Sequence, residues 1–333
     1  MEGFFPHPVR GRFILLAWLA LAAIAAFALS LSLGSVSIPA ADLWQLLWHD
    51  DGSTHYRIVH ELRLPRTLSA FGVGAVLAVA GVLMQVLLRN PLGDPYILGV
   101  SGGAAVAVLG AMLLGLPLAW HAPAAFAGAL ASMLLLFALA HSGSWNTARL
   151  LLTGVVLAAG WSALISFILS LSPQAQLPGM LFWLMGDLSD ALDPGLPWLV
   201  LLAGLTGGLL LAPQLNLALR GTMRARALGV ETQRLHLRIY LLASLLTAAA
   251  VSIAGAIGFV GLIAPHMVRL RAGADHRILL PGAALAGGTL LLLADTAART
   301  LIAPMQLPVG VFTAMLGVPV FLYLLRRSYG EQA

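Results

Sequence analysis

The chain has 333 residues, of which 60% are hydrophobic and only 9% charged, and its mean hydropathy of +0.93 excludes a soluble domain, whose surface must be largely polar. Its 18 basic residues outnumber the 13 acidic ones, but every basic residue is Arg, which excludes the Lys-containing phosphate loop of ATP-hydrolysing proteins. The absence of Cys excludes disulfides, thiolate metal sites and iron–sulfur clusters within the chain.

Apolar stretches separated by turn signals predict about ten helices, most of them near the roughly 20 residues that cross a hydrocarbon core. The first stretch follows Arg10 and Arg12 and is longer than the apolar core of a signal peptide, so we expect a retained helix. In chain order the predicted helices are 12–33, 66–88, 96–115, 122–141, 148–170, 194–213, 235–254, a short 262–271, 277–298 and 308–326. The expected fold is therefore an all-α integral membrane protein with a single transmembrane domain over 1–333.

The distribution of Arg predicts the orientation of this domain. If the predicted helices alternate in direction, 14 Arg residues share the face of the N-terminus and four lie on the opposite face: Arg57, Arg63, Arg66 and Arg299. Because basic residues concentrate on the cytoplasmic side of membrane proteins, both termini are expected in the cytoplasm. The excess of basic over acidic residues thus reflects the topology of the chain in the membrane. We expect contacts with membrane lipid and no binding of nucleic acid.

A short pattern recurs 174 residues apart and predicts inverted repeats. Ala80-Gly81, Val86, Leu88 and Pro91 return as Ala254-Gly255, Val260, Leu262 and Pro265. The two helices that carry the pattern would run in opposite directions, as in transporters built from inverted repeats. The first repeat is placed at about 63–171, helices 2–5, and the second at about 235–327, helices 7–10. A linker with helix 6 at about 172–219 and a polar loop at 220–231 separate them.

Motifs along nearly the whole chain carry a resemblance to a known family. They are Arg63-Leu-Pro-Arg66, Gly81-Val-Leu-Met-Gln85, Asn90-Pro-Leu-Gly-Asp-Pro95, Leu98-Gly-Val-Ser-Gly102, Gly258-Phe-Val-Gly261, Pro265-His266, Asp275-His-Arg277, Leu293-Ala-Asp295, Leu307-Pro-Val-Gly310 and Gly317-Val-Pro319. In this order and spacing the chain resembles FecCD- and BtuC-type permeases of ATP-binding-cassette (ABC) type II importers for iron–siderophores, haem and cobalamin. No single motif is as specific as the combination.

The resemblance implies a transport permease and not an enzyme. It implies a homodimer with the pathway along the dimer axis, in a bacterial inner membrane, with two cytoplasmic ATP-binding subunits and a periplasmic substrate-binding protein. ATP and Mg²⁺ would be bound by the partner ATPase subunits, and no cofactor or metal is expected in this chain. We expect the cargo to be an iron chelate, a ferric siderophore or haem, with cobalamin as the alternative within the family.

Outer and inner site residues follow from the same resemblance. Arg63, Arg66 and Arg299 match the arginines that receive acidic side chains of the binding protein, because a guanidinium offers a bidentate fork to a carboxylate. A structural alternative is that these residues anchor the interface, or that Arg299 pairs with Asp295 four residues before it.

On the inner face, the loop 220–231 resembles the coupling helix that fits a cleft on the ATPase. Leu228 and Val230 would be its apolar anchors and Arg224 and Arg226 its rim charges, with Gly229 and Glu231 in the same segment. The alternative is a basic loop that binds lipid headgroups.

A cytoplasmic gate is also expected. Asn90, Pro91 and Leu92 match a turn that narrows the pathway, and Thr147 would lie in a second constriction, although ordinary cytoplasmic turns remain an alternative for both.

A different class of protein, an ion-coupled secondary transporter, would need acidic residues inside its spans, and Asp295 is the candidate.

Overall fold

The computed structural model describes residues 9–34, 36, 38–50, 52–140, 145–219, 221–303 and 305–330. These residues form an α-helical bundle in which we find no strand. The helices that correspond to the ten predicted ones are α1 (Val9–Ser32), α4 (Leu64–Leu87), α5 (Val100–Leu113), α6 (His121–Ala140), α7 (Thr147–Leu171), α9 (Gly195–Ala218), α11 (Thr232–Ala254), α12 (Val260–Ala272), α13 (His276–Thr300) and α14 (Val309–Gly330).

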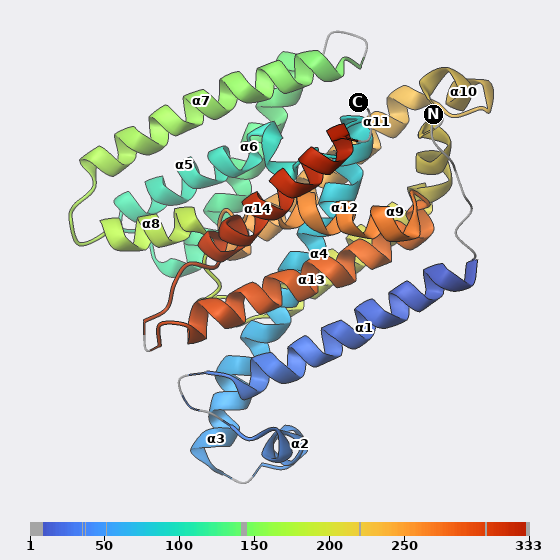
Figure 1. The fold of residues 1–333 in the computed structure, drawn as a ribbon. Coiled ribbons are helices and arrows are strands. Elements are labelled where there is room, and N and C mark those ends of the chain that lie inside the picture. Colours follow the sequence, from blue (N-terminus) through green and yellow to red (C-terminus); the bar gives the residue numbers. More distant parts are fainter. Residues whose placement is uncertain are drawn as a thin grey trace.

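Short helices connect the long ones and lie at the two ends of the bundle. They are α2 (Ala40–Trp48), α3 (Thr54–Arg57), a π-helical segment (Ile58–Arg63) that runs directly into α4, two 3₁₀ turns (Pro95–Leu98 and Leu118–Trp120), α8 (Leu177–Met185) and α10 (Thr222–Ala227). In Figure 1, α8 lies at the left and α2 and α3 lie at the bottom, whereas α10 lies at the upper right, α1 begins at the right and α14 ends near the top. The bundle therefore has two distinct ends.

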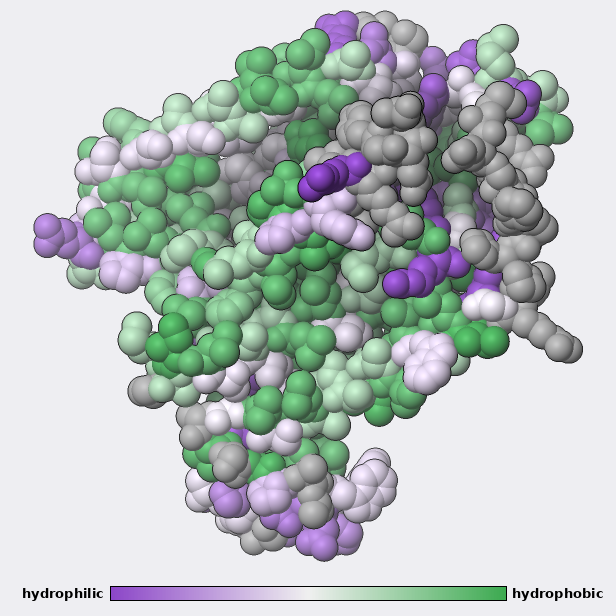
Figure 2. Space-filling model, in the orientation of Figure 1, coloured by the Kyte–Doolittle hydropathy of each residue, from purple (hydrophilic) through white to green (hydrophobic). Residues whose placement is uncertain are grey.

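Seven helical segments of the described chain are long and apolar enough to cross a membrane: 11–32, 54–87, 118–140, 147–171, 195–218, 232–254 and 276–300. Two further helices, α5 and the first part of α14, are apolar but shorter. Figure 2 shows apolar surface across the middle of the molecule, with polar surface toward the upper right and at the bottom. This distribution fits a hydrocarbon layer around the middle and water at the ends.

Helix α4 forms the centre of the bundle and is apolar on every side because other helices surround it. All of its residues from Ser69 to Leu87 are buried, and it contacts α9, α11, α12 and α13. Two glycine pairs let backbones meet here: a Cβ added at Gly287 would lie 2.7 Å from the carbonyl oxygen of Gly74, and one at Gly81 would overlap the backbone of Gly261. Small residues at such crossings are the usual way in which helices pack tightly in lipid.

Candidate functional site

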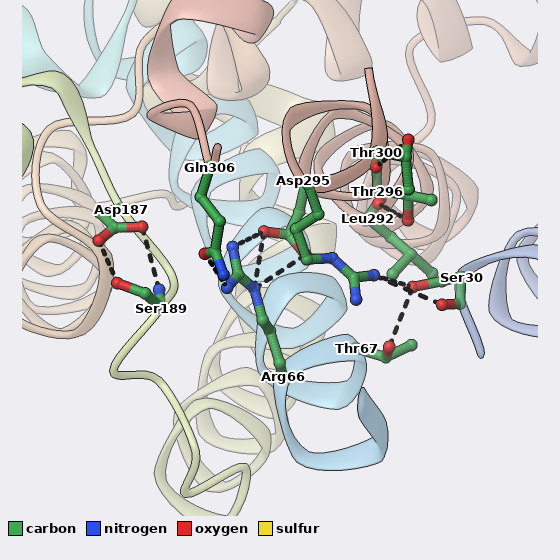
Figure 3. Close-up of polar contacts among 11 residues, drawn as sticks. Ser30, Arg66, Thr67, Asp187, Ser189, Leu292, Asp295, Thr296, Thr300 and Gln306 are labelled. Carbon is green, nitrogen blue, oxygen red and sulfur yellow. Dashed lines mark hydrogen bonds and ion pairs between the residues drawn. The ribbon is translucent and has the colours of Figure 1, made fainter. Parts of the chain in front are cut away.

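The end of the bundle that the Arg distribution predicts to face outward, called the outer end below, holds a buried ion pair between the beginning of α4 and the end of α13. Arg66 lies in the first turn of α4, and its Nε and Nη2 donate to Oδ1 of Asp295 at 3.0 and 2.8 Å. Its Nη1 donates to Oε1 of Gln306, which follows α13, at 2.9 Å (Figure 3). Asp295 is completely buried, and Arg66 is 7% exposed. The pair therefore lies in a low-dielectric environment in which both partners are needed.

Arg299 shares the same carboxylate and extends the network to α1. Its Nε lies 3.1 Å from Oδ2 of Asp295, one helical turn before it, and its Nη2 donates to Oγ of Ser30 at 2.8 Å. The hydroxyls of Ser30 and Thr67 lie 3.0 Å apart (Figure 3). The i to i+4 pair that the sequence offered as an alternative for Arg299 is thus present. No pattern in the sequence marks the hydroxyl of Ser30 as a partner of Arg299.

Arg63 binds backbone instead of a carboxylate. It ends the π-helical segment before α4, is 5% exposed, and its Nη1 donates to the carbonyl oxygens of Leu31 and Ser32 at 2.7 and 3.2 Å. Its Nη2 donates to the carbonyl of Val36. A planar guanidinium with five donors can satisfy several carbonyls at once, which fixes the chain that leaves α1.

The three predicted docking arginines therefore come together, although they are far apart in the sequence. All three line one outer cleft of about 350 Å³, together with Gln306 and Ser189. Arg66 and Arg299 share the carboxylate of Asp295, whereas Arg63 binds backbone carbonyls. Among these side chains three positive charges therefore meet one negative charge, which leaves the cleft with an excess of positive charge. Such a cleft attracts an acidic side chain from outside.

At the opposite end, which is predicted to face the cytoplasm and is called the inner end below, the predicted gate residues form a tight turn after α4. The Oδ1 of Asn90 accepts from the backbone N–H of Leu92 at 2.9 Å, and the carbonyl of Asn90 accepts from Gly93 N–H at 3.0 Å. Asn90 and Pro91 are exposed and Leu92 is half-buried. A short polar side chain that bonds two residues ahead makes an Asx turn. Helix α4 itself ends before this turn, and Arg89, between the helix and the turn, has a left-handed φ of +50° and donates its N–H to the carbonyl of Val86.

Asp94 and Tyr96 attach this turn to the second half of the chain. Oδ1 of Asp94 accepts from Tyr96 N–H at 2.7 Å, and the Tyr96 hydroxyl accepts from Ile257 N–H at 3.2 Å. Burial raises the pKa of Asp94 to about 6, and the hydrogen bond from Tyr96 opposes this rise. The loop thus holds a carboxyl group that titrates near neutral pH.

The predicted coupling segment has its own geometry. Helix α10 spans only 222–227, and Arg220, at the start of the predicted loop, lies outside the described residues. Leu228 is 60% exposed, whereas Val230 is 8% exposed and packs in the core of this chain. Gly229 between them has φ +84°. Of the two expected apolar anchors, only Leu228 is exposed to a partner, because Val230 packs against other residues of this chain.

The remaining inner residues meet around a second cleft. Glu231 pairs with Arg234 at 2.8 Å on the surface, and Arg224 is exposed. Arg226 donates from Nε to Oγ1 of Thr232 at 2.9 Å. Arg226 and Thr147 line the same cleft of about 400 Å³, together with Arg89, which precedes the gate turn. The structure thus brings the ends of the gate and coupling segments close together.

A polar junction on the same face joins three long helices. Asp275 caps α13, accepting from Arg277 N–H at 3.1 Å, and it also accepts from Nδ2 of Asn216 in α9 at 2.8 Å. Arg12 of α1 lies 3.7 Å from its Oδ2. Burial would raise the pKa of Asp275, but these hydrogen bonds and the charges of Arg12 and Arg277 lower it on balance. The carboxylate therefore stays ionised where the three helices meet.

Comparison with known proteins identifies the family. The model of the FecCD transport family matches residues 21–327. The chain is 43% identical over 317 residues to the hemin transport system permease protein HmuU of Yersinia pestis, covering 91% of this chain and 92% of that protein. It is 42% identical over 315 residues to the vitamin B12 import system permease protein BtuC of Serratia proteamaculans, covering 93% and 91%. The chain belongs to the FecCD transport family.

A solved structure agrees with this FecCD assignment. An inward-facing conformation of a metal-chelate type ABC transporter matches with a TM-score of 0.81 and 32% identity, covering 94% of this chain and 99% of that one. The FecCD permease is thus the transmembrane subunit of an ABC importer, and in such importers separate subunits hydrolyse ATP. The ion-coupled alternative is therefore wrong, and Asp295, its candidate site, is held by Arg66 and Arg299.

Proposed function

We propose that this permease carries an iron chelate, a ferric siderophore or haem, across the bacterial inner membrane, driven by ATP hydrolysis in partner subunits. The observation that carries the proposal is the 43% identity to a hemin permease over nine-tenths of the chain. The match to a metal-chelate type transporter points to the same class of cargo. Cobalamin is the second candidate, and it is supported by the 42% identity to a vitamin B12 permease.

The proposed topology has ten crossings, both termini in the cytoplasm and two inverted repeats, α4–α7 and α11–α14. The start of α1, α10 and the end of α14 lie at one end of the bundle, which supports a shared side for the termini (Figure 1). A second copy of the chain completes the pathway. Helix α7 supports this, because only Leu150 and Gly154 of its 25 residues are buried, and Leu152, Val155 and Val156 are exposed apolar side chains.

The proposed docking site for the periplasmic binding protein is the outer cleft of Arg63, Arg66 and Arg299. Its support is the excess of positive charge over the single carboxylate of Asp295. An acidic side chain of the binding protein would gain a charge-assisted hydrogen bond there without displacing Asp295. Arg63 is the most suitable residue for a test, because it makes no ion pair with a described residue and its loss leaves the pair with Asp295 intact.

We also propose that the turn Asn90–Leu92 and Thr147 form the cytoplasmic gate, and that the segment 222–231 couples it to the ATPase. The proximity of Thr147, Arg89 and Arg226 around one cleft supports a mechanical link between the two. Leu228 is the apolar side chain available to a partner, whereas Arg224, Gly229 and Glu231 form an exposed polar rim around it.

Uptake into proteoliposomes tests the proposed function. The chain would be reconstituted with its ATPase and binding protein, and haem, a ferric siderophore and cobalamin would be offered in parallel with and without internal ATP. ATP-dependent uptake of an iron chelate is expected. Uptake of cobalamin alone would assign the second candidate, and uptake without ATP would contradict the ABC mechanism.

Replacing Arg63 tests docking. Arg63→Gln removes a positive charge from the cleft but keeps an amide N–H₂ that can donate to the backbone carbonyls there, so stimulation of ATPase activity by the binding protein should fall while basal activity remains. Arg57→Gln makes the same charge change at an exposed position of α3 and serves as the matched control. Equal stimulation in the two variants would refute the docking role.

A further inference from the structure

The inner cleft of about 400 Å³ is lined by cationic and polar side chains from four parts of the chain. Its walls are Arg89 after α4, Trp145, Asn146, Thr147 and Ala148 at the start of α7, Thr222 and Arg226 of α10, and Thr232, Gln233 and His236 of α11. No Asp or Glu is among these lining residues. The nearby carboxylate of Glu231 is engaged by Arg234 at 2.8 Å. The charge of the cleft is therefore positive and not compensated by its own walls.

Two long helices begin at this cleft, and their first turns add to its positive potential. Backbone N–H groups at a helix start point outward and carry the positive end of the helix dipole. Asn146 caps α7 through one bond, to Arg149 N–H at 3.1 Å. The N-cap residue of α11, Glu231, makes no side-chain hydrogen bond to the backbone N–H groups of that helix. Donors at both starts are thus available to an anion.

A buried donor at the cleft also lacks a partner. The indole N–H of Trp145, which lines the cleft, is buried and has no hydrogen-bond partner within the described chain. The Trp145 ring packs against His236, which is 7% exposed and lines the same cleft, at a centroid distance of 5.4 Å. A buried donor without a partner costs about 1–3 kcal/mol, so such groups usually mark a missing ligand or water.

Arg226 is held in position for a ligand. Its Nε donates to the buried hydroxyl of Thr232 at 2.9 Å, which fixes the plane of the guanidinium. Among the described residues its two terminal nitrogens have no hydrogen-bond acceptor. A guanidinium fixed at Nε and open at its terminal nitrogens suits the two oxygens of a phosphate group.

We propose that this cleft binds a phosphate-class anion, with Arg89 and Arg226 as charged ligands and the indole N–H of Trp145 as a buried donor. Free phosphate and the headgroup of an anionic lipid share this chemistry. The binding itself does not depend on the transport proposal, although the topology proposed above would place the cleft on the cytoplasmic side. An anion here would join the start of α7 to α10 and α11, and so would hold the proposed gate and coupling segments together.

The experiment uses the full chain in a maltoside detergent, which contains no phosphorus. Broadening of the ³¹P resonance of inorganic phosphate reports binding of the free anion. In a second arm, native mass spectrometry measures retention of phosphatidylglycerol against phosphatidylcholine. Arg226→Gln should weaken binding about tenfold or more, the loss of one charge-assisted contact. Arg224→Gln, which removes the same charge two residues away and outside the cleft, is the matched control.

Each outcome decides the proposal. Phosphate binding that Arg226→Gln reduces and Arg226→Lys restores supports a free anion, and selective loss of phosphatidylglycerol in Arg226→Gln supports a lipid headgroup. The lysine variant keeps the positive charge. Binding by this variant would show that Arg226→Gln loses the anion because the charge is missing and not because the chain is misfolded. Equal effects of Arg224→Gln and Arg226→Gln would overturn the site. The absence of binding in both arms would also overturn the site. If Arg226→Gln then weakened binding of the ATPase, the cleft would be a contact for protein and not for an anion.

Discussion

Replacing Asp295 by Asn should strongly destabilise the fold, because it removes the buried carboxylate that Arg66 and Arg299 share. Asp295 is completely buried, it accepts from Arg66 at 2.8 and 3.0 Å, and its Oδ2 lies 3.1 Å from Nε of Arg299. Breaking a buried ion pair by removing one partner costs about 3–5 kcal/mol. Arg66 and Arg299 keep side-chain exposures of 8% and 10% at the rim of the cleft, so some solvation remains. We therefore expect a loss of about 3 kcal/mol, at the lower end of this range.

The assay is unfolding of the full chain by sodium dodecyl sulfate in mixed micelles, followed by far-ultraviolet circular dichroism. Asp190→Asn provides the matched control, because Asp190 is exposed and makes no ion pair with a described residue. The control should change the free energy of unfolding by less than about 0.5 kcal/mol, as is usual for surface substitutions. Salt should alter the difference between the variants little, because buried pairs are weakly screened.

A double-mutant cycle tests the reasoning directly. Arg66→Met should also be destabilising, but Asp295→Asn should cost less in the Arg66→Met background than alone, because the carboxylate has already lost one partner. The coupling free energy between the two positions should exceed about 1 kcal/mol. A loss below about 1 kcal/mol for Asp295→Asn alone, or additive effects of the two changes, would refute the picture of a shared buried pair.

Three other predictions concern packing, pH and coupling. Gly81→Ala should destabilise the chain by about 1–3 kcal/mol or more in the same unfolding assay, because its methyl group meets backbone, whereas Gly110→Ala, with open space around it, should not. The raised pKa of Asp94, about 6, means that the protonated side chain stabilises the fold below pH 4 and that this stability is lost as the pH rises through 6. Asp94→Asn should therefore raise the free energy of unfolding by about 2 kcal/mol near pH 8 and leave it unchanged near pH 4. A difference between variant and parent that is the same at both pH values would contradict the raised pKa. Leu228→Asp should reduce co-purification of the ATPase without changing the free energy of unfolding, because Leu228 is exposed, whereas Val230→Asp should lower that free energy, because Val230 is buried. Unchanged co-purification of the ATPase with Leu228→Asp would exclude Leu228 as the contact.

The long helices were predictable from sequence because charge sets their ends. A buried or lipid-facing helix cannot carry many charges, so stretches without charge outline α1, α4, α9 and α13 within a few residues. The alternating direction of the predicted helices also placed Arg63, Arg66 and Arg299 at the same end of the bundle. In the structure the three residues line one cleft. By contrast, α2 and α3 were not predicted, because the segment between α1 and α4 contains no long apolar run.

The partners of the arginines could not be predicted, because they depend on tertiary packing. Gln306 is 240 residues from Arg66 in sequence, and Ser30 is 269 residues from Arg299. A single Gln after a helix, or a single Ser in the last turn of an apolar one, has no periodicity that marks it as a ligand. The burial of Val230 was equally hidden, since a valine beside a flexible glycine fits an exposed anchor and a core position alike.

The polar contacts at the two ends of α13 indicate which parts of the bundle can move. At the outer end Asp295 binds α4 through Arg66, and Arg299 binds α1 through Ser30. At the inner end Asp275 binds α9 through Asn216 and lies 3.7 Å from Arg12 of α1. Helices α1 and α13 are thus joined at both ends and, with α4 and α9, form a frame.

A conformational change that opens a pathway must leave such a frame intact, since each buried charge would otherwise lose its partner. Helix α7 lies outside it, with only Leu150 and Gly154 buried, and its first turn meets the inner cleft. We therefore expect α7 to move relative to the frame during transport. An anion bound in the cleft between α7, α10 and α11 would then hold the first turn of α7 in place before the movement begins.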